Sequence, residues 1–157
     1  MRPARGARRR RERGAWHRPK STVHTDATPL HRAFSCHVRG SDGRWLLSRR
    51  AVSKLTWPGV WTNAFCGHPD LGEEPTATIA RHGLAELGIT VDASRLTLAL
   101  PDFRYRAVDD SGVVENEICP VWILDADVAP EPNPKRSPRS VGSRPPTWTR
   151  WSTTRRS

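Results

Sequence analysis

The chain has 157 residues, of which 26 are Lys or Arg and 16 are Asp or Glu, and it contains three cysteines. This length fits one domain that can bury a hydrophobic core. An odd number of cysteines without an apolar leader argues against a disulfide framework and indicates reduced thiols, so we expect a cytoplasmic protein. The basic N-terminal end has no apolar run beside it, so we expect neither a signal peptide nor a membrane span.

The positive charge is concentrated at the two ends. Residues 1–22 carry nine basic residues and one acidic residue, residues 131–157 carry seven and one, and residues 23–130 carry ten basic and fourteen acidic residues. We therefore expect a basic disordered arm at 1–22, a folded domain at 23–130, and a Pro/Arg/Ser-rich disordered tail at 131–157. Deleting this tail should leave stability nearly unchanged.

Three interpretations of the ends stay open. The ends are basic arms for an anionic partner, solvated disordered segments, or amino-acid sequence translated from a shifted reading frame of GC-rich DNA. Because neither end contains a nucleic-acid-binding module, we do not expect nucleic acid to be a partner.

The first predicted elements are two strands and a helix. Residues 32–38 and 44–49 are strand-like, and the Gly-Ser-Asp-Gly sequence of residues 40–43 predicts the turn between them. Residues 76–87 are expected to form a helix, because a proline precedes them and a glycine follows them.

The later elements are all strands. Residues 96–107 and 113–124 are β-rich, and the turn-forming residues 109–112 between them predict a hairpin. One helix among hairpin-connected strands predicts an α+β domain.

Residues 57–69, with the sequence WPGVWTNAFCGHP, are the most informative segment of the chain. They place the thiol of Cys66 two residues from the imidazole of His68, next to aromatic and turn-forming residues. A single cysteine is more often an inert core residue than a catalyst. Further imidazoles and carboxylates, however, complete a set suited to a divalent metal beside a thiol. They are His24, His31, Glu115 and Glu117.

Six blocks in a fixed order carry a resemblance to a known family. They are HT…PLHRAFS from His24, RRAVSK from Arg49, WPGVWTN from Trp57, CGHP from Cys66, PDFRYR from Pro101 and ENEICP from Glu115. On these blocks the chain resembles type I isopentenyl-diphosphate delta-isomerases, a branch of the Nudix superfamily, over about residues 20–121. The resemblance implies an α/β/α Nudix-type sandwich with a mixed sheet. The family's second helix and final strand have no counterpart, so the C-terminal part is missing or replaced.

The resemblance also implies a reaction and its catalytic residues. Isopentenyl and dimethylallyl diphosphate are interconverted by protonation on one face of the carbon skeleton and deprotonation on the other. Cys66 and Glu117 correspond to these two groups, and Tyr105 assists the glutamate side. The implied partner is a small-molecule diphosphate, and we expect a monomer that does not associate with membranes.

The resemblance implies two kinds of divalent ion and a set of substrate contacts. One ion, Mn, Zn or Mg, corresponds to the ligands His24, His31, His68, Glu115 and Glu117. A Mg²⁺ that accompanies the diphosphate corresponds to Glu86. The positions that match substrate-binding residues are Lys20, Arg50, Lys54, Trp57, Trp61 and His82, the last of which is usually arginine in the family.

Two alternative functions stay open. The Nudix signature is matched at Gly67, Glu73, Arg81, Glu86, Gly88 and Ile89, whereas His82 and Ala85 replace two of its glutamates. Hydrolysis of a diphosphate needs several carboxylates that hold Mg²⁺, so a Nudix-type hydrolase is the second interpretation. A catalytically impaired metal- and diphosphate-binding remnant is the third, because no tryptophan of the tail aligns with the family's C-terminal pocket tryptophan.

Overall fold

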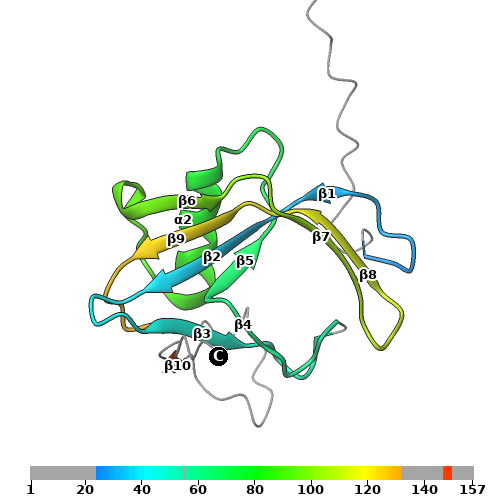
Figure 1. The fold of residues 1–157 in the computed structure, drawn as a ribbon, viewed down its shortest axis with the longest axis horizontal. Coiled ribbons are helices and arrows are strands. Elements are labelled where there is room, and N and C mark those ends of the chain that lie inside the picture. The colour runs from blue at the N-terminus through cyan, green and yellow to red at the C-terminus, as the bar shows by residue number, and fades with distance from the viewer. Residues whose placement is uncertain (1–23, 55, 132–146, 150–157) are drawn as a thin grey trace, which may run out of the picture.

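The computed structural model describes residues 24–54, 56–131 and 147–149, which form two sheets and one α-helix (Figure 1). The larger sheet contains seven strands, and the main path across it runs β10-β3-β2-β9-β6. Its strands are β2 (Phe34–Arg39), β3 (Trp45–Arg49), β4 (Trp61–Thr62), β5 (Phe65–Gly67), β6 (Leu96–Leu100), β9 (Val121–Asp125) and β10 (Thr147–Thr149). The smaller sheet has the order β1-β8-β7, with β1 (His31–Arg32), β7 (Arg104–Val108) and β8 (Val114–Ile118).

Both sheets are connected through the same two chain segments. Only Ala33 separates β1 from β2, and only Cys119 and Pro120 separate β8 from β9. The strand pairs β1–β8 and β2–β9 are both parallel, whereas the other pairings are antiparallel. The side chains of the smaller sheet are therefore held in a fixed relation to the core of the larger one.

The helix α2 (Pro75–Leu87) packs against β2 and β5. Pro75 occupies its first turn, and Gly88 ends it in the left-handed conformation with φ of 66°, which a residue without Cβ adopts at little cost. A short 3-10 helix, η1 (Ala93–Arg95), leads into β6. The core lies between α2 and the sheet and includes Phe34, Cys36, Val38, Leu46, Phe65, Ile79, Leu87 and Leu124.

Most of the predicted elements and the α+β class are confirmed. The two early strands, the helix next to Pro75 and the hairpin at residues 109–112 form, and the sheets are mixed. The β-rich runs 96–107 and 113–124 differ from the prediction, because each is divided into two strands, one in each sheet. Within the described residues α2 is the one α-helix, so they contain a single helical layer of the expected sandwich. None of the helices in this part of the chain is long and apolar enough to cross a membrane.

The C-terminal segment differs from the prediction at two points. Glu131 donates its backbone N–H to the carbonyl of Leu87 at 2.8 Å, and β10 pairs with β3 in antiparallel register. We expected no element in residues 131–157, whereas the structure has a strand at residues 147–149, and the domain boundaries stay a prediction. The arm at 1–22 and the remainder of the tail lie outside the described residues.

Candidate metal centre and active site

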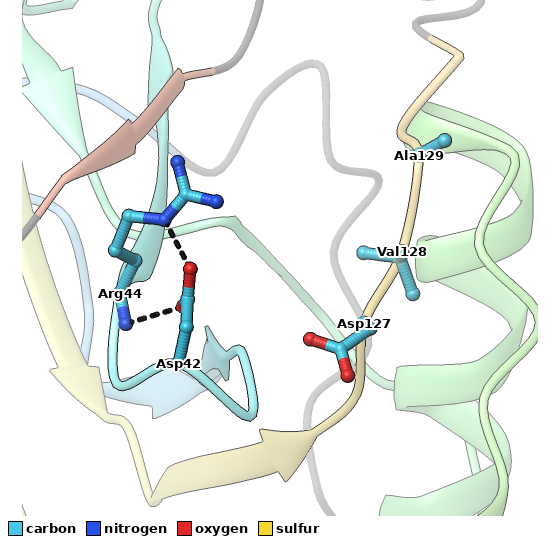
Figure 2. Close-up of a pocket in the computed structure, with 5 residues that line it drawn as sticks. All are labelled: Asp42, Arg44, Asp127, Val128 and Ala129. Carbon is cyan, nitrogen blue, oxygen red and sulfur yellow. Dashed lines mark hydrogen bonds and ion pairs between the residues drawn. The ribbon is translucent and has the colours of Figure 1, made fainter.

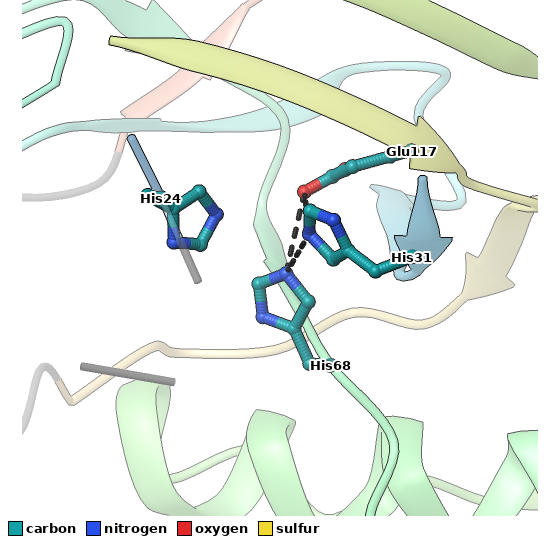
Figure 3. Close-up of side chains that lie close together, drawn as sticks. All are labelled: His24, His31, His68 and Glu117. Atoms are coloured by element: carbon teal, nitrogen blue, oxygen red, sulfur yellow. Dashed lines mark hydrogen bonds and ion pairs between the residues drawn. The ribbon is translucent and has the colours of Figure 1, made fainter. Parts of the chain in front are cut away.

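Four side chains from distant parts of the chain bring their ligand atoms together (Figure 3). They are His24, His31, His68 and Glu117, and their ligand atoms all lie within 4.8 Å of one another. Nε2 of His31 lies 3.1 Å from Nε2 of His68, and Oε1 of Glu117 lies 3.4 Å and 3.3 Å from these two nitrogens. We call this group the His/Glu cluster.

Strand register explains why the cluster forms. In the smaller sheet Glu117 is the parallel partner of His31 on one side and the antiparallel partner of Tyr105 on the other. Paired residues on neighbouring strands point to the same face, so these three side chains share one surface. His68 follows β5 directly and approaches the same carboxylate from the larger sheet.

The geometry of the cluster fits a divalent ion. Nδ1 of His31 lies 2.9 Å from the carbonyl oxygen of Pro29 and can donate to it, so Nε2 of the neutral ring carries a lone pair. That lone pair faces Nε2 of His68 and Oε1 of Glu117. Electron-rich atoms this close together need a proton or a cation among them. Nitrogen and oxygen ligands held about 2.1 Å from a tetrahedral zinc are roughly 3.4 Å apart, close to the observed separations.

Glu115 is attached to the cluster indirectly. The hydroxyl group of Tyr105 lies 2.7 Å from Oε2 of Glu115 and 3.0 Å from Oε2 of Glu117, so it bridges the two carboxylates. Burial, followed by the charge of Glu117, raises the pKa of Tyr105, which keeps the phenol protonated as a donor. The cluster as defined by ligand-atom distances contains Glu117 and not Glu115, so a ligand role for Glu115 stays a prediction.

The charges within the cluster influence one another. Burial alone would raise the pKa of Glu117, which is only 6% exposed, but when no cation is bound the protonated forms of His31 and His68 can donate hydrogen bonds to it, and these outweigh burial, so the pKa is lowered. The hydrogen bond to Glu117 raises the pKa of His31, whereas burial and the two other imidazoles lower the pKa of His24. Glu117 is therefore an ionised carboxylate at neutral pH.

Cys66 lies on β5, opposite Ser35 of β2, and its side chain is open to solvent. Protein atoms nevertheless surround it closely enough for desolvation, followed by repulsion from Glu86, to raise its pKa to about 11. The charge of Arg50 opposes this shift, and that of Glu117 adds to it. Cys66 is thus an accessible, protonated thiol within electrostatic reach of both carboxylates and of Arg50.

The remaining predicted substrate contacts lie along the loop between β3 and β4. Arg50 donates to the carbonyl and hydroxyl oxygens of Thr56, and Lys54 is exposed. Trp57 is half-buried, and Trp61, on β4, is 40% exposed. These assignments stay predictions, and Lys20 lies outside the described residues.

His82, which matches a substrate-binding position of the family, is buried, and a contact between it and a substrate stays a prediction. Its imidazole is only 4% exposed and packs edge-on against the ring of Phe34. Nδ1 lies 2.9 Å from Oε1 of Glu86, and Nε2 lies 3.4 Å from the carbonyl oxygen of His68. Both ring nitrogens therefore face protein atoms, because the ring is enclosed by α2, β2 and the end of β5.

One contact that supports the site was not predicted. Trp57 has φ of 45°, an unusual left-handed conformation for a bulky residue, and its N–H donates to Oδ2 of Asp109 at 3.3 Å. Asp109 also accepts from Ser111 and Val113 in the turn between β7 and β8. The Asp-Asp-Ser-Gly sequence identified this turn, but nothing in the sequence indicated its contact with the tryptophan loop.

Two pockets lie outside the cluster. One of about 330 Å³ is lined by Asp42, Arg44, Asp127, Val128 and Ala129 beside the turn between β2 and β3 (Figure 2). The other, of about 490 Å³, lies by the first turns of α2, and its lining includes Arg32, Ile118 and Trp122. Neither is lined by a residue of the predicted isomerase site, although Glu73 of the Nudix signature lines the second pocket.

Comparison with known proteins identifies the class that this fold and site define. The NUDIX domain model matches residues 29–151, well over half of the chain. Solved structures with a similar fold include DR0079 from Deinococcus radiodurans, at 20% identity and a TM-score of 0.57 over 86% of this chain and 74% of that one. The MutT protein from Methanosarcina mazei Go1 matches at 18% identity and a TM-score of 0.56 over 78% of each chain. The chain belongs to the NUDIX domain family.

More similar relatives share one name. Proteins named isopentenyl-diphosphate Delta-isomerase match at 65% identity over 103 residues in Leifsonia xyli subsp. xyli and at 57% over 113 residues in Kocuria rhizophila. These matches cover 66% and 72% of this chain and 56% and 62% of the relatives. The chain thus spans about three fifths of the length of these relatives.

Proposed function

We propose that the chain is an isomerase that interconverts isopentenyl diphosphate and dimethylallyl diphosphate. One observation carries the proposal: an accessible thiol, Cys66, lies within electrostatic reach of Glu117, which is also the carboxylate of the His/Glu cluster. The name shared by relatives at up to 65% identity supports the same reaction.

In the proposed mechanism, two groups act on opposite faces of the substrate's carbon skeleton. Cys66 holds a proton on one face and Glu117 an acceptor on the other, so that one proton can be added while another is removed. Tyr105 holds the second oxygen of Glu117 by a hydrogen bond and fixes the orientation of the carboxylate. Trp57 and Trp61 would shield the positive charge that develops between the two steps.

A divalent ion bound by His24, His31, His68 and Glu117, with Glu115 behind it, would supply positive charge that tunes the basicity of the carboxylate. The identity of this ion as Mn, Zn or Mg belongs to the proposal. Arg50, Lys54 and Lys20 would bind the diphosphate, together with a Mg²⁺ that Glu86 holds.

Hydrolysis of a diphosphate is the second candidate, and the contacts of the signature residues disfavour it. Glu73 is engaged in a two-point ion pair with Arg81, and it precedes α2. With His82 and Ala85 at two glutamate positions of the signature, Glu86 is the one carboxylate on α2, which is too few for the several metal ions that hydrolysis requires. A catalytically impaired remnant that only binds metal and diphosphate is the third candidate.

We also propose a monomer in a reducing, cytoplasmic compartment. The three cysteines within the described residues are all free, which supports this location. The proposal includes neither a nucleic-acid partner nor a membrane partner.

An assay with labelled isopentenyl diphosphate tests the reaction. We expect Cys66→Ala and Glu117→Gln each to lower isomerisation about a hundredfold or more, because each removes a positioned proton donor or acceptor. Glu74→Gln, which changes an exposed carboxylate without a side-chain cap bond, is the matched control. Release of phosphate by the parent chain would favour the hydrolase, and metal binding without either activity would favour the remnant.

A further inference from the structure

His82 and Glu86 form a pair one helical turn apart on α2. Nδ1 of His82 donates to Oε1 of Glu86 at 2.9 Å, and no other hydrogen bond to this carboxylate occurs among the described residues. One carboxylate oxygen is thus held by the imidazole, while Oε2 is left without a protein donor in this part of the chain. The Glu86 side chain is 32% exposed, so this second oxygen can reach a ligand.

The position of the imidazole is fixed on all sides. A Cβ at Gly67 would lie only 2.3 Å from Cε1 of His82, so the ring occupies the space that a side chain at position 67 would need. The ring of Phe34 packs edge-on at a centroid distance of 5.3 Å. The third contact is between Nε2 and the carbonyl oxygen of His68, at 3.4 Å. An imidazole enclosed in this way has little freedom to change its rotamer.

Glu86 needs such a partner because of its place in the helix. It lies in the last turn of α2, where the helix dipole disfavours a negative charge, and this turn contains no basic residue. A glutamate side chain also has three rotatable bonds, whose freedom must be lost before it can bind a cation at a fixed place. The rigid imidazole of His82, four residues earlier, stabilises the negative charge of Glu86 and also restricts the motion of its side chain.

From this geometry we infer that His82 is a positioning residue: it orients Glu86 so that the free oxygen points to the cation that accompanies a diphosphate. The inference rests on the proposed function for the presence of that diphosphate. Because the same imidazole contacts the carbonyl of His68, it also connects the cation-binding carboxylate with the loop that carries a member of the His/Glu cluster. His82 therefore acts through Glu86 rather than by touching the substrate.

The test measures Mg²⁺ affinity of the full chain by calorimetry in the presence of inorganic pyrophosphate. We expect His82→Leu to weaken Mg²⁺ binding about tenfold or more, the effect of losing one hydrogen bond to a carboxylate. His82→Asn, whose amide nitrogen can occupy the place of Nδ1, should restore most of the affinity. The ion bound to the His/Glu cluster, measured by elemental analysis, should stay unchanged in both variants.

A double-mutant cycle with Glu86→Gln separates positioning from general destabilisation. If His82 acts through Glu86, its replacement should cost little further Mg²⁺ affinity once Glu86 has been changed. Equal and additive losses in both backgrounds, or parent-like Mg²⁺ affinity in His82→Leu, would overturn the inference, as would a parent chain that binds no Mg²⁺ with pyrophosphate. If His82→Leu does not fold, His82→Gln replaces it in the cycle, because its amide can occupy the place of Nε2 but not that of Nδ1, and so it removes the hydrogen bond to Glu86 while keeping a polar contact with the carbonyl of His68.

Isomerase activity distinguishes the two proposals. A parent chain that shows this Mg²⁺ dependence but converts no isopentenyl diphosphate contradicts the proposed function and leaves the role of His82 standing. Conversely, an active chain in which His82→Leu raises neither the Mg²⁺ requirement nor the KM for the diphosphate contradicts the inference alone.

Discussion

At the scale of single residues, Glu117 is the side chain on which most contacts of the site converge. Its two oxygens face His31 and His68 on one side and Tyr105 on the other. A buried carboxylate is costly unless it is hydrogen-bonded and near positive charge. The cluster provides the hydrogen bonds, and a bound cation would supply the charge.

Replacing a histidine of the cluster should remove the ion. We expect His68→Ala to lose the tightly bound divalent metal in elemental analysis at neutral pH, because two of the three shortest ligand separations involve its Nε2. His37→Ala is the matched control, since His37 contacts Ser35 and Trp45 outside the cluster. In the parent chain, metal affinity should fall below about pH 6.5 as protons compete for the imidazoles. Unchanged metal content in His68→Ala would contradict the assignment.

Gly67 shows how a single missing side chain supports the site. We expect Gly67→Ala to destabilise the domain by about 1–3 kcal/mol in urea unfolding, because the new Cβ would overlap the imidazole of His82. The cost should be smaller in a His82→Ala background, where the ring is absent. Equal costs in the two backgrounds would show that the close approach does not limit position 67.

At the scale of elements, α2 is anchored at its N-terminal side by an ion pair. Arg81 donates to both oxygens of Glu73 at 2.8 Å and 2.7 Å, across the loop that precedes the helix. This hydrogen bonding is the main reason why the pKa of Glu73 is lowered from 4.5 to about 2. The pair therefore fixes the loop after His68 relative to the helix.

The pH dependence of stability should report this pair. Because the pKa of Glu73 is lowered in the folded state, its stabilisation is present above pH 4.5 and is lost as the pH falls towards 2. We expect Glu73→Gln to cost about 1 kcal/mol at pH 7, a modest value because Arg81 is partly exposed. The difference from the parent should disappear near pH 2. Glu74→Gln is the control, and a difference that persists at low pH would speak against the ion pair.

At the scale of the whole molecule, the residues of the His/Glu cluster all come from the segment between residues 24 and 117. The C-terminal strand, β10, contributes no residue to the cluster. The strand β10 extends the far edge of the larger sheet by pairing with β3. The seven-stranded sheet thus includes a segment that we expected to be unstructured, although none of its residues belongs to the cluster.

Truncation tests this division. A chain that ends at Glu131 loses β10 and should be less stable by about 1 kcal/mol, or roughly 3 °C in melting temperature, since one short edge strand is removed. Its metal content should be the same as that of the parent. A chain that ends at Thr149 keeps β10 and is the control. An unchanged melting temperature after truncation at Glu131 would restore the original expectation, and loss of metal would show that the C-terminal segment supports the site.

The sequence by itself determined the local structure and the set of side chains available for metal binding and catalysis. Proline and glycine at the ends of α2 and the turn at residues 109–112 act through backbone geometry, so they could be located without any long-range contact. Strand alternation likewise placed Glu115 and Glu117 on one face of β8. The distinction between these two carboxylates depends on the register that puts Glu117 opposite both His31 and Tyr105, which only the tertiary structure decided.

The tertiary structure also decided the environment of His82 and the pairing of the C-terminal strand. A family pattern suggested that His82 contacts the substrate, but the absence of a Cβ at Gly67 and the ring of Phe34 enclose the imidazole inside the domain. Polar composition suggested no element at residues 147–149, yet the unpaired edge of β3 supplies the backbone partners that a short polar segment lacks by itself. Such contacts join residues far apart in the chain, and local propensity contains no information about them.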